Sequence, residues 1–295
     1  MTSVCDYEGS RYRYEFWEGH GREYEDLAER MALSALLPSS GNVLIEIGAG
    51  YGRLADLYQG YQQVVLLDYA RSQLEEAQRY LSHLDRYTLV VGDVYRLPFV
   101  DDLFDALTMV RVMHHLADAP RALAELQRVL RPAGVVVLEH ASKHHLKAIA
   151  RWLLGRQAWN PFDLQPVEFA DLNFDFHPRW VRQQLAAAGF EPESVRSVSH
   201  FRIPLLKERV PPRWLAALDG LAQPTGRWWQ LSPSVFVRAR AQKPFAGPPH
   251  GFFCCPLCRS ADLSPREGSL VCGGCRRQWS TQGGIYDFKT PLFSP

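Results

Sequence analysis

Five of the six cysteines of this 295-residue chain lie together in the stretch "CCPLCRSADLSPREGSLVCGGC". Cys255 and Cys258 form one Cys-x-x-Cys pair, and Cys272 and Cys275 form a second pair after thirteen intervening residues. Two such pairs on adjoining turns can present four thiolates to one tetrahedral metal ion, as in structural zinc sites. Proline and glycine inside the pairs favour the tight turns that this requires. We therefore predict a zinc ion held by these four cysteines.

Disulfide bonds are the alternative for these thiols. The first twenty residues are polar and aromatic, unlike a signal peptide, and no apolar run approaches the ~20 residues that span a bilayer. We therefore expect a cytoplasmic protein, in which thiols stay reduced and metal binding is favoured over disulfides. Cys254 is left as a spare thiol, because its spacing to Cys258 is the less common Cys-x3-Cys. A segment of this size builds little core, so a metal would supply its stability.

A glycine-rich loop, "EIGAGYG", follows the first buried run of the chain. Gly48, Gly50 and Gly52 allow a tight turn and a close approach of the backbone to a ligand. The loop alone fits a nicotinamide dinucleotide site or a simple turn equally well. Asp68 ends the next apolar run, about 20 residues on, where a carboxylate can accept both hydroxyls of an adenosine ribose. Asp93 ends the third run and is expected beside the same crevice.

Further along the chain, short runs of consecutive apolar residues, without alternating polar ones, lie between segments with helical periodicity. Such runs are typical of parallel strands that are covered on both faces. Alternation of strands and helices at this spacing predicts an α/β, Rossmann-like, doubly wound and mostly parallel sheet. We expect strands at 64–67, 88–91, 106–110, 134–139, 194–203 and 234–242, helices at 23–37, 71–84, 119–134 and 178–188, and helix and loop at 140–175.

Five segments in order resemble the class I S-adenosylmethionine-dependent methyltransferases, of the type 11-like kind. They read "EIGAGYG", "VVLLDYA", "GDVYRLPF", "DLFDALTMVRVMHHL" and "RVLRPAGVVVLE". The resemblance covers about 42–139 and extends more loosely to about 242. A dehydrogenase usually carries GxGxxG, whereas here the third glycine comes one residue early. The resemblance implies methyl transfer with S-adenosylmethionine as the cofactor.

The same resemblance implies cofactor-binding roles for individual residues. Gly48, Gly50 and Gly52 would surround the methionine portion of the cofactor, and Asp68 would bind its ribose. Arg111 would line the pocket of the methyl donor; its alternative is a surface ion pair. The remaining implied cofactor contacts are Glu46, Ala49, Tyr69, Asp93 and the backbone of Val94, with a turn cap as the alternative for Asp93.

The segment "EFWEGHGREYEDLAER" resembles the part of related methyltransferases that closes over the cofactor. Tyr14 and Trp17 would supply aromatic cover, and Arg22 would supply a cation for the methionine carboxylate. The alternative is an amphipathic helix that is fixed by packed aromatic residues.

Three histidines are candidates for a general base or a substrate contact. His114 and His115 follow the fourth expected strand, and His140 follows the fifth, so all three should reach the edge where substrates enter. Methyl transfer needs a base only when the acceptor must lose a proton. The Asn/Asp-Pro-Pro-aromatic pattern of amino-group nucleic-acid methyltransferases is missing after the fourth strand. Only Cys5 lies outside the cysteine cluster, which argues against covalent pyrimidine C5 methylation.

Two insertions are expected to cover the acceptor. In the first, Lys143, Lys147 and Arg151 are four residues apart, which places them on one face of a helix. A basic amphipathic helix can lie on a membrane or on phosphates, and the other interpretation is a lid with its cations in water. The second insertion carries Trp214, Trp228 and Trp229 near arginines, which suits either a planar or anionic acceptor or a packed cap.

The end of the chain, "CPLC…LVCGGCRRQWSTQGGIYDF", resembles the small zinc-binding activator proteins that partner class I methyltransferases. Those methyltransferases act on tRNA, rRNA and a translation factor. The alternative is a generic zinc ribbon with a structural role. We expect a methyltransferase domain at 1–242, with an N-terminal lid at about 10–37 and insertions at about 140–176 and 203–231, then a linker at 243–251 and a zinc ribbon at 252–295.

The net charge of +1 gives no global attraction to nucleic acid or membranes. Our main hypothesis is therefore a methyltransferase for a small molecule or metabolite, whose ribbon stabilises or activates the catalytic domain. RNA or protein methylation, with the ribbon recruiting the substrate, is the alternative; Arg276 and Arg277 beside Trp279 favour it. A third possibility is a cofactor-binding scaffold without catalysis. The sequence leaves the oligomeric state, the acceptor and the methylated atom open.

Overall fold

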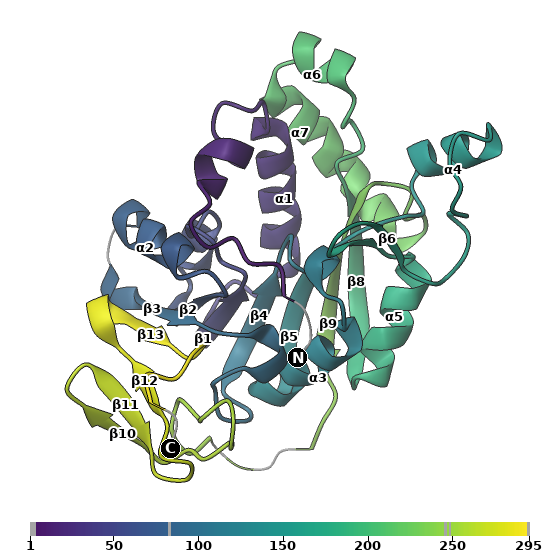
Figure 1. The fold of residues 1–295 in the computed structure, drawn as a ribbon. Helices are drawn as coiled ribbons and strands as arrows, with labels where there is room; N and C mark the ends of the chain where they lie inside the picture. The colour runs from purple at the N-terminus through teal and green to yellow at the C-terminus, as the bar shows by residue number, and fades with distance from the viewer. Residues whose placement is uncertain (1–3, 82–83, 245–246, 248, 294–295) are drawn as a thin grey trace.

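The computed structural model describes residues 4–81, 84–244, 247 and 249–293. Within these residues, the strands form one eleven-stranded sheet in the order β10-β11-β12-β13-β3-β2-β1-β4-β5-β9-β8 and a separate two-stranded ribbon, β6-β7. Figure 1 shows the large sheet crossing the molecule, with the C-terminal strands extending it at one edge.

The middle of the sheet is parallel, in the order β3-β2-β1-β4-β5. Its strands are largely buried and rich in Val, Leu and Ile, as parallel strands covered on both faces usually are. β9 runs antiparallel between β5 and β8. The predicted Rossmann-like class is confirmed. The bounds are β1 Gly41–Ile47, β2 Tyr61–Asp68, β3 Tyr87–Val91, β4 Phe104–Met109, β5 Leu130–Ala141, β8 Phe190–Val198 and β9 Ser234–Ala241.

Helices cover both faces of this sheet, and each face has its own core. On one face Leu126 of α3 and Leu185 of α5 pack with the sheet. On the other face Leu33 of α1, Leu74 of α2 and Leu215 of α7 do so. The helices are α1 Glu23–Leu36, α2 Arg71–Tyr80, α3 Ala119–Val129, α4 Leu146–Leu153, α5 Pro178–Ala187, α6 Pro204–Arg209 and α7 Pro212–Ala222, with short turns of helix at η1 Arg13–Trp17, η2 Ala55–Tyr58, η3 Leu84–Arg86, η4 Val94–Arg96, η5 Met113–His115, η6 Gln223–Arg227 and η7 Gln282–Gly284.

The first insertion differs from the expected helix and loop. It contains the hairpin of β6 (Val167–Ala170) and β7 (Asn173–Asp175), whose strands have only four and three residues, too few for a strand pattern to stand out. The prediction that Lys143 lies on the basic face of a helix is also wrong. That residue lies before α4, is buried, and its Nζ donates to the carbonyl of Gln165 at 2.7 Å.

The C-terminal module contains β10 (Leu263–Arg266), β11 (Ser269–Cys272), β12 (Gln278–Ser280) and β13 (Ile285–Asp287). β13 pairs in parallel with β3, so the module continues the central sheet (Figure 1). The predicted linker at 243–251 lies partly outside the described residues. No helix in the described part of the chain has the length and apolar character needed to cross a membrane.

Candidate functional site

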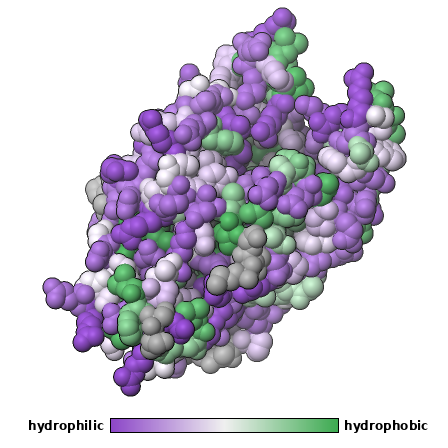
Figure 2. Space-filling view, viewed as in Figure 1, coloured by the Kyte–Doolittle hydropathy of each residue, from purple (hydrophilic) through white to green (hydrophobic). Residues whose placement is uncertain are grey.

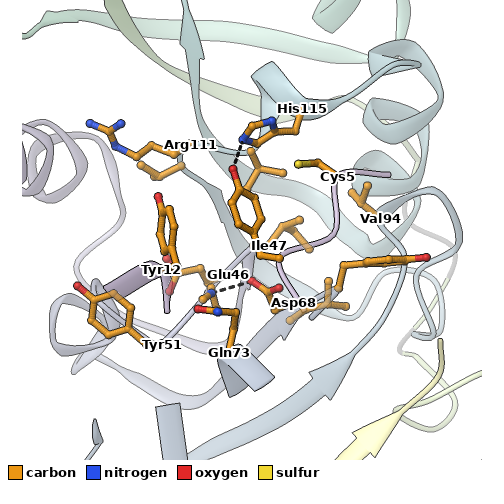
Figure 3. A pocket seen from close by; sticks show the side chains of 18 of the residues that line it. Cys5, Tyr12, Glu46, Ile47, Tyr51, Asp68, Gln73, Val94, Arg111 and His115 are labelled. Atoms are coloured by element: carbon orange, nitrogen blue, oxygen red, sulfur yellow. Dashed lines mark hydrogen bonds between the residues drawn. The ribbon is translucent and has the colours of Figure 1, made fainter. Parts of the chain in front are cut away.

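A cavity lies at the carboxyl ends of β1, β2 and β4, where these strands are followed by loops (Figure 3). This is the edge at which open α/β sheets bind ligands. The N-terminal segment covers it. Its lining includes Cys5, Tyr7, Tyr12, Trp17, Glu46, Gly48, Ala49, Gly50, Tyr51, Arg53, Asp68, Tyr69, Gln73, Val94, Arg111 and His115.

The glycine loop forms the floor of this cavity. Gly48 and Gly50 have φ values of +69° and +54°, in the left-handed region that favours glycine. A Cβ atom on Gly48 would lie 2.1 Å from Cγ2 of Val112, so any side chain there would clash. The loop therefore passes close beneath the cavity and leaves its space open.

Asp68, at the end of β2, holds the glycine loop in place through hydrogen bonds. One carboxylate oxygen accepts the backbone N–H of Gly50 at 2.8 Å, and the other accepts that of Ala70 at 2.9 Å. Burial raises the pKa of Asp68, and the backbone N–H donors oppose that rise. The carboxylate thus faces the cavity while two amides orient it.

Glu46 is a buried carboxyl group in the cavity wall. Its Oε2 has no hydrogen-bond partner among the described residues. Burial raises the pKa of Glu46 to about 8, although the neighbouring Arg53 opposes the rise. A buried carboxyl oxygen without a partner is costly, and a cationic ligand in the cavity would satisfy it.

Two arginine side chains that stack on Trp17 hold the N-terminal segment over the cavity. Trp17 of η1 is buried, with the guanidinium carbons of Arg53 and Arg111 at 3.8 and 4.8 Å from its ring centroid. Both arginines bind the buried carboxylate of Glu29, at 2.7 Å from Arg53 and 2.8 Å from Nε of Arg111. These cations hold the pKa of Glu29 below its ordinary value, against the effect of burial. Charge and stacking together close the cavity.

His115 meets the N-terminal segment on the far side of the cavity. Its Nδ1 lies 3.0 Å from the carbonyl of Leu172, and its Nε2 lies 3.0 Å from the hydroxyl of Tyr7 (Figure 3). A carbonyl only accepts, so Nδ1 carries the proton and Nε2 accepts from Tyr7. Burial lowers the pKa of His115, which favours this neutral form.

The structure places ten of the predicted site residues in the cavity wall and six elsewhere. Asp93 caps η4, with its side chain accepting from the N–H of Tyr95 at 2.9 Å, which is the alternative role considered for it. Tyr14 is exposed, and Arg22 stacks on Phe16 at 3.6 Å. Gly52, His114 and His140 also lie outside the lining, which contains Trp17, Glu46, Gly48, Ala49, Gly50, Asp68, Tyr69, Val94, Arg111 and His115.

Sequence reasoning missed several lining residues, above all Tyr7, Tyr12 and Arg53. Tyr7 precedes the lid expected at about 10–37, whereas Tyr12 lies inside it but was not singled out. The sequence signal for Tyr12 is the density of aromatic and basic residues in "YRYEFW". Arg111, expected in the donor pocket, does line the cavity but directs its guanidinium to Glu29.

The four cysteines of the two Cys-x-x-Cys pairs form one cluster, with all four sulfurs within 4.8 Å of one another. Cys255 and Cys275 are 3.6 Å apart, and Cys258 and Cys272 are 3.4 Å apart. These distances exceed a disulfide bond but are close to the ~3.8 Å between sulfurs around a tetrahedral ion with 2.3 Å bonds. Cys254 stands apart, since its thiol donates to the carbonyl of Phe99. The cluster therefore has the geometry of a metal site.

Part of the chain, including the strands around the cavity, is similar to known methyltransferases. Residues 45–138 match the family model for a methyltransferase domain. A demethylmenaquinone methyltransferase of Clavibacter sepedonicus is 35% identical over 105 residues, which cover 35% of this chain and 43% of the relative. A ubiquinone/menaquinone biosynthesis C-methyltransferase of Paracoccus denitrificans is 33% identical over 132 residues, covering 42% and 52%. The chain thus spans about half the length of these relatives.

A solved structure shares the fold over a longer stretch. It comes from the complex of a putative methyltransferase with a methyltransferase activator from Haloferax volcanii. It has a TM-score of 0.55 and 19% identity, and it covers 82% of this chain and all of that chain. At this identity the likeness describes the fold only.

Proposed function

We propose that this chain is an S-adenosylmethionine-dependent methyltransferase that acts on a small-molecule acceptor. The observation that carries the proposal is the cavity over the glycine loop, which the N-terminal segment covers and whose floor lies in the stretch that matches the methyltransferase domain. The residues present fit the cofactor. Glu46 offers an unsatisfied buried carboxyl oxygen to a cationic group, and Asp68 offers an oriented carboxylate to hydroxyl groups.

Each part of the cavity has a distinct task in this proposal. Asp68 would hold the ribose hydroxyls, and Glu46 would face the positively charged methionine portion. Gly48 and Gly50, which have no side chains, would leave room for that portion of the cofactor. The cofactor supplies an electrophilic methyl group when bound. The protein's share is orientation and exclusion of water, which the buried Trp17 and its two arginines provide from above.

A small acceptor is favoured by the enclosure of the cavity. The N-terminal segment brings Cys5, Tyr7 and Tyr12 into its wall, and a polymer would have to displace this segment to reach the methyl group. Aromatic walls suit a planar acceptor. The two curated relatives named above are quinone methyltransferases, and we propose an acceptor of comparable size and aromatic character here.

The proposed proton acceptor is His115. Of the three candidate histidines, His115 is the one that lines the cavity. Its hydrogen bonds fix the tautomer in which the acceptor nitrogen Nε2 faces Tyr7. His114 and His140 are excluded from this role by position, since neither is part of the lining. A proton released by a bound hydroxyl or activated carbon would pass to the hydroxyl oxygen of Tyr7 as the Tyr7 proton moves to Nε2 of His115, which then carries the positive charge.

Replacement of His115 tests both the role and the reaction. We expect His115→Gln to lower kcat by about 10²–10⁴-fold, the usual contribution of a positioned base, with cofactor affinity little changed. Release of S-adenosylhomocysteine should be measured with demethylated quinols and other phenols, and with RNA and peptides for comparison. His114→Gln is the matched control. Methyl transfer to RNA alone would contradict the small-molecule acceptor. Turnover unaffected by His115→Gln would contradict the role of His115 as the base.

Cofactor affinity should depend on pH through Glu46. Because its pKa is about 8 in the free protein, the carboxyl is protonated at neutral pH and must lose a proton to pair with a cation. Affinity should therefore rise by up to about tenfold per pH unit between pH 6 and 8. The raised pKa also means that the contribution of Glu46 to folding stability, fully present below about pH 4.5, is lost as the pH rises through 8.

Titration calorimetry with S-adenosylmethionine across this range measures the effect. In Glu46→Gln the side chain no longer titrates, so most of the slope should disappear. Asp93→Asn, whose side chain caps η4 outside the cavity, is the control and should keep the slope. A wild-type affinity that is flat from pH 6 to 8 would remove Glu46 from the cationic end of the ligand.

We further propose that the four-cysteine cluster binds zinc and that residues 252–295 form a zinc ribbon attached to a catalytic domain at 1–242. Thiolate ligands in two Cys-x-x-Cys pairs are typical of zinc, and reduced thiols suit a cytoplasmic location. The ribbon would stabilise the catalytic domain from the edge of its own sheet. This proposal draws on the pairing of β13 with β3.

A further inference from the structure

One end of the molecule carries many exposed apolar side chains that no part of the proposed function uses. In Figure 1, α4 and α6 project from this end, and α7 lies below α6. Figure 2 shows hydrophobic residues at the tips of both projections. We call this region the projecting surface; its apolar residues, each at least half exposed, are Leu146, Leu153, Leu154, Leu205, Trp214, Leu218, Leu221, Trp228 and Trp229.

The apolar residues of α7 form a stripe along its outer face. Trp214, Leu218 and Leu221 follow the i, i+4, i+7 spacing of one helix face and are 68%, 50% and 81% exposed. Leu215 and Asp219, on the inner face, are buried. A surface helix normally turns polar residues to water, so a second apolar face indicates a second contact.

α4 repeats this arrangement with positive charge added. Only Ala148 of this helix is buried, while Leu153 and Leu154 near its end are about two-thirds exposed. The stretch 144–159 contains three lysine or arginine residues and no acidic residue, although the net charge of the whole chain is only +1. Positive charge is thus concentrated where the apolar residues are exposed.

Several basic residues of the projecting surface lack acidic partners, although Arg202 and Lys207 bind Glu25. Among the described residues, no carboxylate pairs with Lys147, Arg156, Arg209 or Arg213, whereas Arg30 and Arg128 each bind carboxylates elsewhere in the molecule. The stretch 202–229 has five basic and two acidic residues, and one of the acidic residues, Asp219, is buried against His200.

A second cavity lies at the base of α4 and shares this charge. Arg179 and Arg182 of α5 and Arg227 of η6 line it, together with His144 and Trp229 and with no acidic residue. No described carboxylate pairs with these three arginines. The guanidinium of Arg227 instead stacks on Trp228, with 4.5 Å to the ring centroid. Guanidinium groups without carboxylates favour phosphate.

We propose that the projecting surface docks onto a bilayer of anionic phospholipids. Leucines on separate projections can enter a deformable interface side by side, whereas a globular protein would need one matching surface for all of them. Tryptophan with arginine and lysine is typical of the level of lipid head groups. The arginine-lined cavity would receive head-group phosphates. This docking is independent of the acceptor that the catalytic cavity takes.

Vesicle co-sedimentation with the full chain tests the proposal. We expect binding to phosphatidylcholine vesicles with about 30% phosphatidylglycerol, weaker binding in high salt and little binding to phosphatidylcholine alone. Each basic residue near an anionic surface strengthens binding about fivefold, so Lys147→Gln with Arg156→Gln should weaken it about 25-fold. Arg266→Gln, on β10 of the ribbon, is the matched control for charge.

The apolar contribution has its own variants. Leu153→Glu with Leu154→Glu, and separately Trp214→Glu, should abolish sedimentation while thermal melting and cofactor binding stay unchanged. Leu292→Glu replaces a leucine of similar exposure (58%) near the C-terminus, away from α4 and α6 (Figure 1), and should bind like the wild type. Equal binding to both kinds of vesicle, or wild-type binding by the α4 double variant, would overturn the proposal. So would a dimer in solution that the same variants dissociate, because a second copy would then be the occupant.

Discussion

Replacing Asp68 by alanine should raise the Kd for S-adenosylmethionine at least a hundredfold. A hydrogen bond to a charged group contributes about 1.5–3 kcal/mol, so losing two such bonds to the ribose corresponds to a factor of roughly 10²–10⁴. The loss has a second source in this structure. The carboxylate also accepts the N–H of Gly50 and thereby fixes the loop beneath the ligand.

Isothermal titration calorimetry is the appropriate measurement, with circular dichroism to verify the fold. Asp93→Ala serves as the comparison, because Asp93 also ends a strand yet uses its carboxylate to cap η4. We expect that variant to lose at most about 2 kcal/mol of stability from the missing cap and to keep its cofactor affinity. An Asp68→Ala variant with wild-type affinity would remove Asp68 from the site.

The part of the site that the sequence predicted lies on the central strands. Runs such as "VVLLD" are apolar without alternation, and only a strand buried on both faces requires that pattern. Once β1 and β2 are recognised, the position of Asp68 next to the glycine loop follows from parallel pairing, as the register of Ile47 with Leu67 shows. Local pattern and topology therefore suffice for the floor of the cavity.

The cover of the cavity could not be predicted in the same way. Tyr7 meets His115 across 108 residues of sequence, and Trp17 meets Arg53 and Arg111 from different elements. No periodicity marks such contacts, because they depend on where an irregular N-terminal segment crosses the finished sheet. For the same reason, the sequence could not separate His115 from its neighbour His114, which differs only in the direction that its side chain takes.

The relation of the C-terminal module to the rest of the chain was also hidden in the sequence. β13 has only three residues, too few for a strand pattern, yet it adds to the edge of the sheet at β3. Edge strands of open sheets present unpaired backbone groups, and one way to protect them is to cover them with another segment. The module that the sequence suggested to be a tethered unit is thus a continuation of the main sheet.

Contacts of the C-terminal module reach the cavity over the glycine loop. Lys289 binds Asp6 of the N-terminal segment at 2.8 Å, and its Nζ lies 3.9 Å from the ring centroid of Tyr69, which lines the cavity. Arg71, which begins α2 directly after the Asp68 turn, donates to the carbonyl of Gln282 at 2.9 Å. A C-terminal module that holds these groups would brace both the N-terminal segment and the end of the cavity at Asp68.

Metal removal should therefore affect the whole edge of the molecule. The purified protein should contain about one zinc per chain, and Cys255→Ser or chelation should remove it. Structural zinc contributes apparent free energies of about 10–16 kcal/mol in zinc-finger peptides, so the ribbon should unfold without it. Hydrogen exchange at Ile285–Asp287 and at the paired residues of β3 should lose its protection, and cofactor affinity should fall as Lys289 and Arg71 lose their partners.

Cys254→Ser provides the control because it changes a buried thiol of the same segment that stands outside the cluster and donates to Phe99. It should keep the metal and the exchange protection of β13. Comparing the two serine variants separates the effect of the ion from that of core packing. If Cys255→Ser lost zinc but kept β13 protected, the pairing with β3 would itself hold the ribbon in place, and the metal would be dispensable for the brace.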